Sequence, residues 1–143
     1  MVNLLFVKFI YNNFMYNSVW FNSLTKPYLN PPSEVFTPVW IILYILIFIS
    51  LLIYIIKPVN TSKVSGYIYF SIQLFLNLIW SPVFFFMQNI GFALFVILLL
   101  NVFVFLTMKS FYKVSPIPAF LLIPYFIWVL FATYLNGAYF VLN

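Results

Sequence analysis

The stretch EVFTPVWIILYILIFISLLIYIIK, residues 34–57, is an almost uninterrupted apolar run with Glu34 at one end and Lys57 at the other. A helix needs about 20 predominantly apolar residues to cross the hydrocarbon core of a bilayer. The run follows a proline-rich segment and ends at Lys57-Pro58, a pair that is typical of helix ends. The stretch therefore predicts a membrane-spanning helix.

The composition of the whole chain predicts the same class of protein. The chain has 143 residues, of which 66% are hydrophobic and only 5% are charged, whereas a soluble domain carries roughly 25% charged residues. So few charges cannot cover a water-exposed surface, and we expect a single all-α, multi-pass integral membrane domain over residues 1–143. The length allows four to five spans joined by short loops.

Residue types that are missing exclude several kinds of chemistry. The chain contains no His, Cys, Arg or Asp, and Glu34 is its only acidic residue. A His/Cys/Asp metal cluster, a disulfide, a Cys nucleophile and a His general base are therefore excluded. The six basic residues are all Lys and are scattered singly, which does not fit a nucleic-acid-binding stripe.

Polar breaks divide the rest of the chain into further apolar runs. The two residues 88–89 form a turn so short that the helices on either side must be antiparallel neighbours. The first run is interrupted by Lys8, Asn12, Asn13 and Asn17, so we expect a short or degraded first helix there. Pro124 should kink the last helix. The predicted helices are 1–19, 34–57, 64–87, 90–109 and 118–142.

The lysines predict how the bundle is oriented. With alternating spans, Lys57, Lys63, Lys109 and Lys113 fall on one side, and Lys8 joins them. Because cytoplasmic loops carry an excess of basic residues, this side is predicted to lie inside. The segment 24–33, the turn 88–89 and the C-terminus then lie outside, and the membrane is the cytoplasmic membrane if the source is bacterial.

The segment 24–40, LTKPYLNPPSEVFTPVW, combines four prolines with the only acid of the chain. Proline fixes its own backbone and biases the preceding residue toward an extended conformation. The segment is therefore predicted to be a stiff loop that covers one mouth of the bundle. Glu34 would favour the N-terminus of the helix that follows.

Polar and aromatic residues within the spans fall on single helical faces. Gln73, Asn77, Trp80 and Ser81 follow the i, i+4, i+7, i+8 pattern. They either join helices through hydrogen bonds or line a pocket. Trp40, Trp80 and Trp128 lie on three different helices at similar predicted depth, which fits either anchoring at the membrane interface or a pocket for a large flat apolar ligand with polar edges.

Three segments together resemble the TspO/translocator protein family, also called tryptophan-rich sensory proteins or peripheral-type benzodiazepine receptors. Residues 20–44 resemble its entry signature, residues 73–85 its third helix and residues 121–136 its fifth helix. The matching residues are Trp20, Leu24, Lys26, Pro27, Pro31, Pro32, Phe36, Trp40, Leu43 and Tyr44, then Gln73, Leu74, Asn77, Trp80, Pro82, Phe84 and Phe85, then Pro124, Tyr125, Trp128, Ala132 and Asn136.

The resemblance implies a five-helix bundle that commonly forms a homodimer and needs no cofactor. It also implies a cavity under the first loop that binds porphyrins such as protoporphyrin IX. Carried over to this sequence, the ligand-binding residues are Phe21, Pro31, Pro32, Trp40, Tyr44, Asn77, Trp80, Trp128 and Ala132. No basic residue follows Tyr139, so the cholesterol-recognition pattern of animal members is missing and we expect no cholesterol transport.

The leading functional hypothesis is therefore a membrane protein that binds tetrapyrroles, or another large apolar small molecule, for porphyrin sensing, transport or disposal. One alternative is light-dependent porphyrin degradation. Its chemistry would use the indole rings, because the sequence offers no acid–base pair. Another is a decayed relative that binds no ligand. Proton-coupled transport through carboxylates is disfavoured, since Glu34 lies at a mouth of the bundle.

Overall fold

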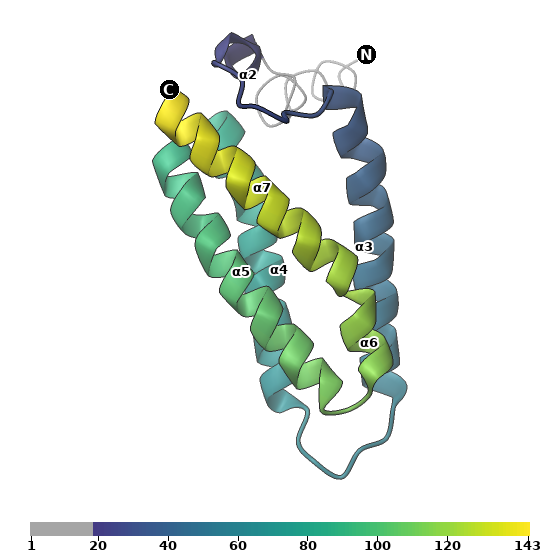
Figure 1. Ribbon diagram of the computed structural model, residues 1–143. Coiled ribbons are helices and arrows are strands. Elements are labelled where there is room, and N and C mark those ends of the chain that lie inside the picture. The colour runs from purple at the N-terminus through teal and green to yellow at the C-terminus, as the bar shows by residue number, and fades with distance from the viewer. Residues whose placement is uncertain (1–18) are drawn as a thin grey trace, which may run out of the picture.

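The computed structural model describes residues 19–143, which are helical apart from short connections and contain no strand. The predicted first helix, residues 1–19, lies outside this part of the chain except for its last position. The helices are α2 (Val19–Ser23), α3 (Ser33–Ile56), α4 (Val64–Ser81), the π-helical turn η1 (Pro82–Phe86), α5 (Ile90–Tyr112), α6 (Pro116–Leu121) and α7 (Ile123–Leu142) (Figure 1).

Four helical units in residues 19–143 are long and apolar enough to cross a membrane. They are α3, α4 with η1, α5, and α6 with α7. Together with the short α2, they form the all-α membrane bundle that the sequence predicts. The chain is therefore a multi-pass membrane protein.

α3 ends where the sequence indicates, and a lysine secures the end. The N–H of Lys57 donates to the Ile53 carbonyl at 3.0 Å. The Lys63 ammonium reaches back across the loop to the carbonyls of Tyr54 at 2.8 Å, Ile55 at 3.0 Å and Lys57. These carbonyls have no helical N–H to bind, so the lysine supplies the missing donors and complements the negative end of the helix dipole.

The connection between α4 and α5 is a π-helical turn followed by a tight reversal. The Met87 N–H donates to the Pro82 carbonyl at 2.9 Å, five residues earlier, and Gln88 has a φ of 55°. Asn89 then caps α5, because its side-chain oxygen accepts from the Phe92 N–H at 3.0 Å. The predicted span 64–87 is thus α4 and η1 in series.

Two helix boundaries differ from the sequence prediction. α5 continues past Lys109 to Tyr112. The predicted helix 118–142 begins earlier, at Pro116 behind the cap Ser115, and is broken at Leu122 into α6 and α7. Pro124 sits in the first turn of α7, where its missing N–H costs no hydrogen bond. The irregularity that Pro124 predicts is therefore a break two residues before it.

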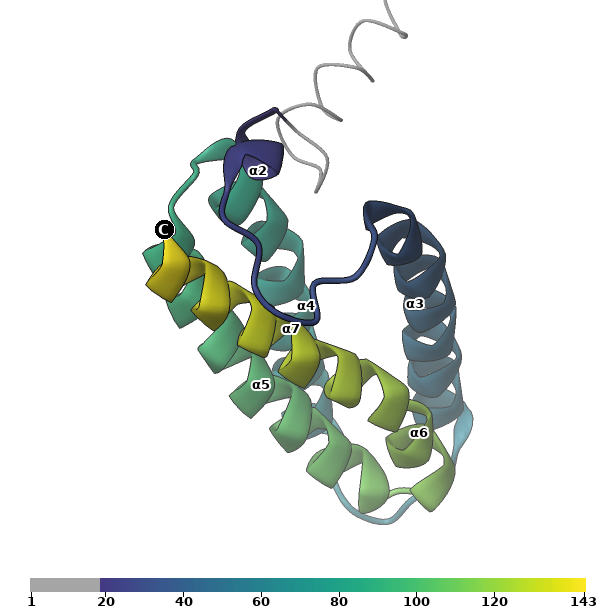
Figure 2. The ribbon, with the colours of Figure 1, turned by 45° about the horizontal axis from the view of Figure 1, so that its top comes forward.

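α3 lies on one side of the bundle, α4 and α5 lie on the other, and α7 crosses between them (Figures 1 and 2). α5 packs against both α4 and α7, while α6 packs against α3 and α5. A buried hydrogen bond from the Ser50 hydroxyl to the Pro118 carbonyl, 2.6 Å long, joins α3 to α6. α3 therefore contacts its neighbours mainly through α6.

Candidate functional site

A cavity of about 340 Å³ lies between α3, α4, η1 and α7, and Phe21 of α2 contributes to its wall. Its lining is mostly aromatic or aliphatic, with four polar residues among sixteen. The lining residues are Phe21, Phe36, Thr37, Trp40, Ile41, Tyr44, Asn77, Trp80, Ser81, Phe84, Phe85, Trp128, Ala132, Leu135, Asn136 and Tyr139. A volume of this size and this lining are typical of sites for drug-sized apolar ligands.

The structure brings seven of the nine sequence-predicted site residues to this one cavity: Phe21, Trp40, Tyr44, Asn77, Trp80, Trp128 and Ala132. Pro31 and Pro32 are not among its lining residues. Pro32 directly precedes α3 with an extended ψ of 144° and is exposed. The two prolines thus direct the chain into α3 and do not form the cavity wall.

The aromatic rings of α3 and α7 meet edge to face. The rings of Trp40 and Trp128 have centroids 6.4 Å apart at 88°, and Phe36 lies 5.9 Å from Trp128 at 69°. Tyr44 is 5.6 Å from Trp40 on the same helix. Such contacts contribute about 0.5–1.5 kcal/mol beyond area burial, so the rings hold one another in place and form a preformed wall.

A chain of hydrogen bonds forms the floor of the cavity. The Tyr44 hydroxyl donates to Asn77 Oδ1, and Asn77 Nδ2 donates to the Tyr125 hydroxyl at 2.9 Å. The Tyr125 hydroxyl donates to Gln73 Oε1 at 2.8 Å. Gln73 therefore joins α4 to α7, as the hydrogen-bonding interpretation expects, whereas Asn77 both joins helices and lines the cavity.

A second set of hydrogen bonds fixes Trp80. Its indole N–H donates to Asn136 Oδ1 at 2.9 Å, and Asn136 Nδ2 donates to the Ile90 carbonyl at 3.1 Å. Asn136 is 1% exposed, so it ties α4, α7 and the start of α5 together at the cavity wall. Trp80 is held inside the bundle and does not serve as a free interface anchor.

Several lining residues were absent from the predicted set. Leu135, Asn136 and Tyr139 follow Ala132 at i+3, i+4 and i+7, so helical periodicity could have identified them. Phe84 and Phe85 are consecutive, and an ordinary helix would place them 100° apart. Both are buried and lie in the π-helical turn, which no pattern in the sequence indicates.

The segment 24–32, which we call the strap, lies against α7. Leu29 turns the chain with a φ of 65°. Two side chains of α7 and that of Asn143, directly after it, bind the strap. The Tyr134 hydroxyl donates to the Tyr28 carbonyl at 2.7 Å, the Tyr139 hydroxyl donates to Asn30 Oδ1 at 2.7 Å, and Asn143 Oδ1 accepts from the Thr25 N–H at 2.9 Å. The proline-rich segment is thus fixed at the end of the bundle where α2 lies (Figure 2).

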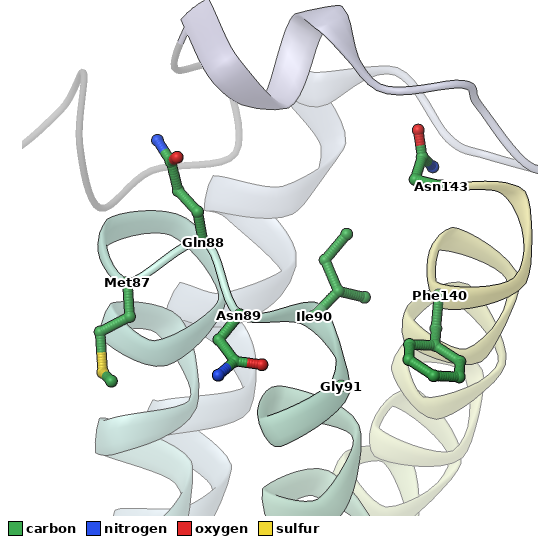
Figure 3. A pocket seen from close by; sticks show the side chains of 7 residues that line it. All are labelled: Met87, Gln88, Asn89, Ile90, Gly91, Phe140 and Asn143. Carbon is green, nitrogen blue, oxygen red and sulfur yellow. The ribbon is translucent and has the colours of Figure 1, made fainter.

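A second pocket, of about 360 Å³, lies at the turn between α4 and α5, and Figure 3 shows its lining from Met87 to Gly91 with Phe140 and Asn143. Two of its three amide side chains already have protein partners. Asn89 caps α5 and Asn143 binds Thr25. Nothing in its side chains converges on a ligand, so the aromatic cavity remains the candidate site. Residues 19–143 also contain no metal-binding group of His, Cys, Asp and Glu.

Comparison with known proteins relates this arrangement to one family. The model of the TspO/MBR family matches residues 1–142. The chain is 44% identical to the tryptophan-rich protein TspO of Chlorobaculum tepidum over 84% of this chain and 77% of that protein. It is 36% identical to the tryptophan-rich sensory protein of Cereibacter sphaeroides, over 79% and 70%. It is 38% identical to the human translocator protein, over 79% and 68%.

Proposed function

The chain belongs to the TspO/MBR family, and from that premise we propose that it binds tetrapyrroles, such as protoporphyrin IX, in the aromatic cavity. The observation that carries the proposal is the cavity of about 340 Å³ walled by rings from α2, α3, α4, η1 and α7. A flat conjugated ligand gains both apolar burial and ring contacts in such a site. The bound porphyrin would be sensed, transported or removed, and no resident cofactor is required.

The two amide side chains of the cavity are compatible with an apolar ligand body. The amides of Asn77 and Asn136 are each engaged on both sides by protein partners. A buried polar group that is already paired can stay in place when an apolar surface covers it. The floor therefore tolerates the hydrophobic face of a macrocycle without requiring a matching polar group from it.

A titration of protoporphyrin IX against the purified protein in a neutral detergent tests the proposal. We expect saturable quenching of tryptophan emission, because Trp40, Trp80 and Trp128 line the cavity. In the double variant Trp40→Phe/Trp128→Phe, binding is followed by porphyrin absorbance and should be at least about ten-fold weaker. Trp20→Phe is the control, because Trp20 packs on the lining residue Phe84 but does not line the cavity itself. Quenching that never saturates would contradict the proposal.

A second candidate function is light-dependent porphyrin breakdown, which the contact between Trp40 and Trp128 favours. Both indoles line the cavity and their ring centroids are 6.4 Å apart, so a light-excited porphyrin bound there would lie beside an oxidisable pair. Illumination of the complex with and without molecular oxygen separates the two functions. Loss of the porphyrin absorbance only with protein, light and oxygen would establish breakdown, whereas stable absorbance would leave binding alone.

We further propose that the lysine-rich end faces the cytoplasm, with the strap and the C-terminus outside. Lys57, Lys63, Lys109 and Lys113 lie in or beside the α3–α4 and α5–α6 connections, which share one end of the bundle (Figure 1). The opposite end has Lys26 and Glu34, whose charges offset each other. This asymmetry is the one that sets orientation in most multi-pass proteins.

A further inference from the structure

Lys26 is not itself a lining residue of the aromatic cavity, but its ammonium packs against two rings that are. Its ammonium lies 3.8 Å from the ring centroid of Phe21 and 5.6 Å from that of Tyr139. Both rings belong to the cavity wall. Since Tyr139 is eleven residues beyond Trp128 on α7, the charge lies about 16 Å along the helix from the tryptophan pair. The cavity lining itself carries no charge, and a positive charge lies against its wall at the strap end.

This cation has no anionic partner among residues 19–143. Its nitrogen donates to the Phe21 carbonyl at 2.7 Å, and its remaining contacts are the faces of the two rings. Glu34, the only acidic residue of the chain, forms no ion pair with it. Shielding from water by these neighbours lowers the pKa of the Lys26 ammonium. A partly desolvated charge without a counter-ion gains more from an incoming anion than a fully hydrated one does.

The side chain can meet a ligand at this position. An ammonium has three donors, and only one of them has a protein acceptor in residues 19–143. Lys26 is exposed as a whole residue although its ammonium is partly shielded by the two rings, and its flexible four-carbon stem lets the charge follow a ligand group at the mouth. Carboxylates are the natural partners of such a donor, and the charge-assisted hydrogen bond is roughly twice as strong as a neutral one.

We propose that Lys26 binds the anionic edge of an amphipathic ligand whose flat apolar body fills the aromatic cavity. The inference rests on the proposed function, and it specifies the class of ligand and its orientation. A porphyrin with two propionate groups on one edge would enter with its apolar edge toward Trp40 and Trp128. Its carboxylates would lie at the strap end, beside Lys26 and the ring of Tyr139. Lys26 is then a specificity-determining residue that selects acids over neutral analogues of the same shape.

The test compares protoporphyrin IX with its dimethyl ester, which keeps the macrocycle and removes both charges. Both are titrated against the full chain in the same neutral detergent, with porphyrin absorbance as the readout. We expect the acid to bind at least about ten-fold more tightly than the ester, in line with a hydrogen bond to a charged group. In Lys26→Gln this preference should disappear because the acid weakens, while affinity for the ester stays unchanged. Lys26→Arg should keep most of the preference.

Lys113→Gln is the matched control, because it removes one positive charge from the opposite end of the bundle. It should leave both affinities unchanged. Equal binding of acid and ester to the unmodified chain would overturn the inference, and so would an equal loss of both ligands in Lys26→Gln. Either outcome would leave tetrapyrrole binding intact. Failure of both porphyrins to saturate the unmodified chain would instead contradict the proposed function itself.

Discussion

Gly66 lies where α4 passes the ring of Tyr54, near the lysine-rich end. A Cβ at this position would overlap the Tyr54 hydroxyl and lie 2.7 Å from the ring carbon Cζ. The ring cannot move away easily, because it stacks on Phe111 at 4.0 Å and its hydroxyl donates to the Lys63 carbonyl at 3.0 Å. We expect Gly66→Ala to lower the free energy of unfolding by about 1–3 kcal/mol, the usual cost of overpacking. Unfolding in mixed detergent and SDS measures it.

Gly137 in α7 is the matched control for this prediction. A Cβ there would have the Leu94 side chain as its nearest neighbour, at 3.9 Å, which is an ordinary contact. Gly137→Ala should therefore be neutral or stabilise the protein by up to about 1 kcal/mol, since alanine favours helix more than glycine does. Equal destabilisation by both substitutions would show that the Tyr54 contact does not explain the effect.

At single positions, the sequence identified which residues share a face but not what they bind. Helical spacing placed Gln73, Asn77 and Trp80 together, and the structure shows that the partners of Gln73 and Trp80 are Tyr125 and Asn136 of α7. Such partners depend on how two helices cross, which a pattern within one helix does not encode. Pro31 and Pro32 were assigned to the site because they belong to the same sequence motif as Trp40. Trp40 lines the cavity, whereas the two prolines do not.

At the scale of elements, the hydrogen bonds between α7 and the strap can be tested by substitution. Two of its hydrogen bonds come from the hydroxyls of Tyr134 and Tyr139. Each is worth about 1 kcal/mol, so the double variant Tyr134→Phe/Tyr139→Phe should raise the open population of the strap roughly thirty-fold. Hydrogen exchange followed by mass spectrometry should show faster exchange in residues 24–32 and unchanged exchange in the middle of α5.

Tyr112→Phe serves as the control for the strap, because Tyr112 is exposed at the other end of the bundle and contacts Phe120 by its ring alone. Its exchange pattern should match that of the unmodified chain. If residues 24–32 exchange equally in the control and in the double variant, the two hydroxyls do not hold the strap.

Element ends show why the sequence prediction of the bundle was close but not complete. The apolar runs located α3, α4, α5 and α7 because membrane spans need long apolar stretches. Lys109 looked like the end of a helix, but a basic residue is favourable within the last turn, so α5 continues to Tyr112. The break at Leu122 depends on how α6 packs on α3 and α5, which composition does not reveal.

At the scale of the whole molecule, the two ends of the bundle differ in charge as well as in shape. The α3–α4 and α5–α6 connections carry the lysines at one end, and α2, the strap, the α4–α5 turn and the C-terminus lie at the other (Figures 1 and 2). Lys63 is bound to the carbonyls that end α3. The other three lysines of this end are exposed, so they stay available for the proposed orientation, in which this end faces the cytoplasm.

The chain has no cysteine, so a single introduced thiol reports orientation without any background. Thr61→Cys lies in the lysine-end loop and Gln88→Cys in the opposite turn, and both native residues are exposed. In intact bacterial spheroplasts expressing each variant, a membrane-impermeant maleimide should label Gln88→Cys at once and Thr61→Cys only after permeabilisation. Labelling of both in SDS verifies that each thiol is reactive. The reverse pattern would place the strap inside, and equal labelling of both thiols before permeabilisation would mean that the lysines do not impose one orientation; either result would contradict the proposed topology.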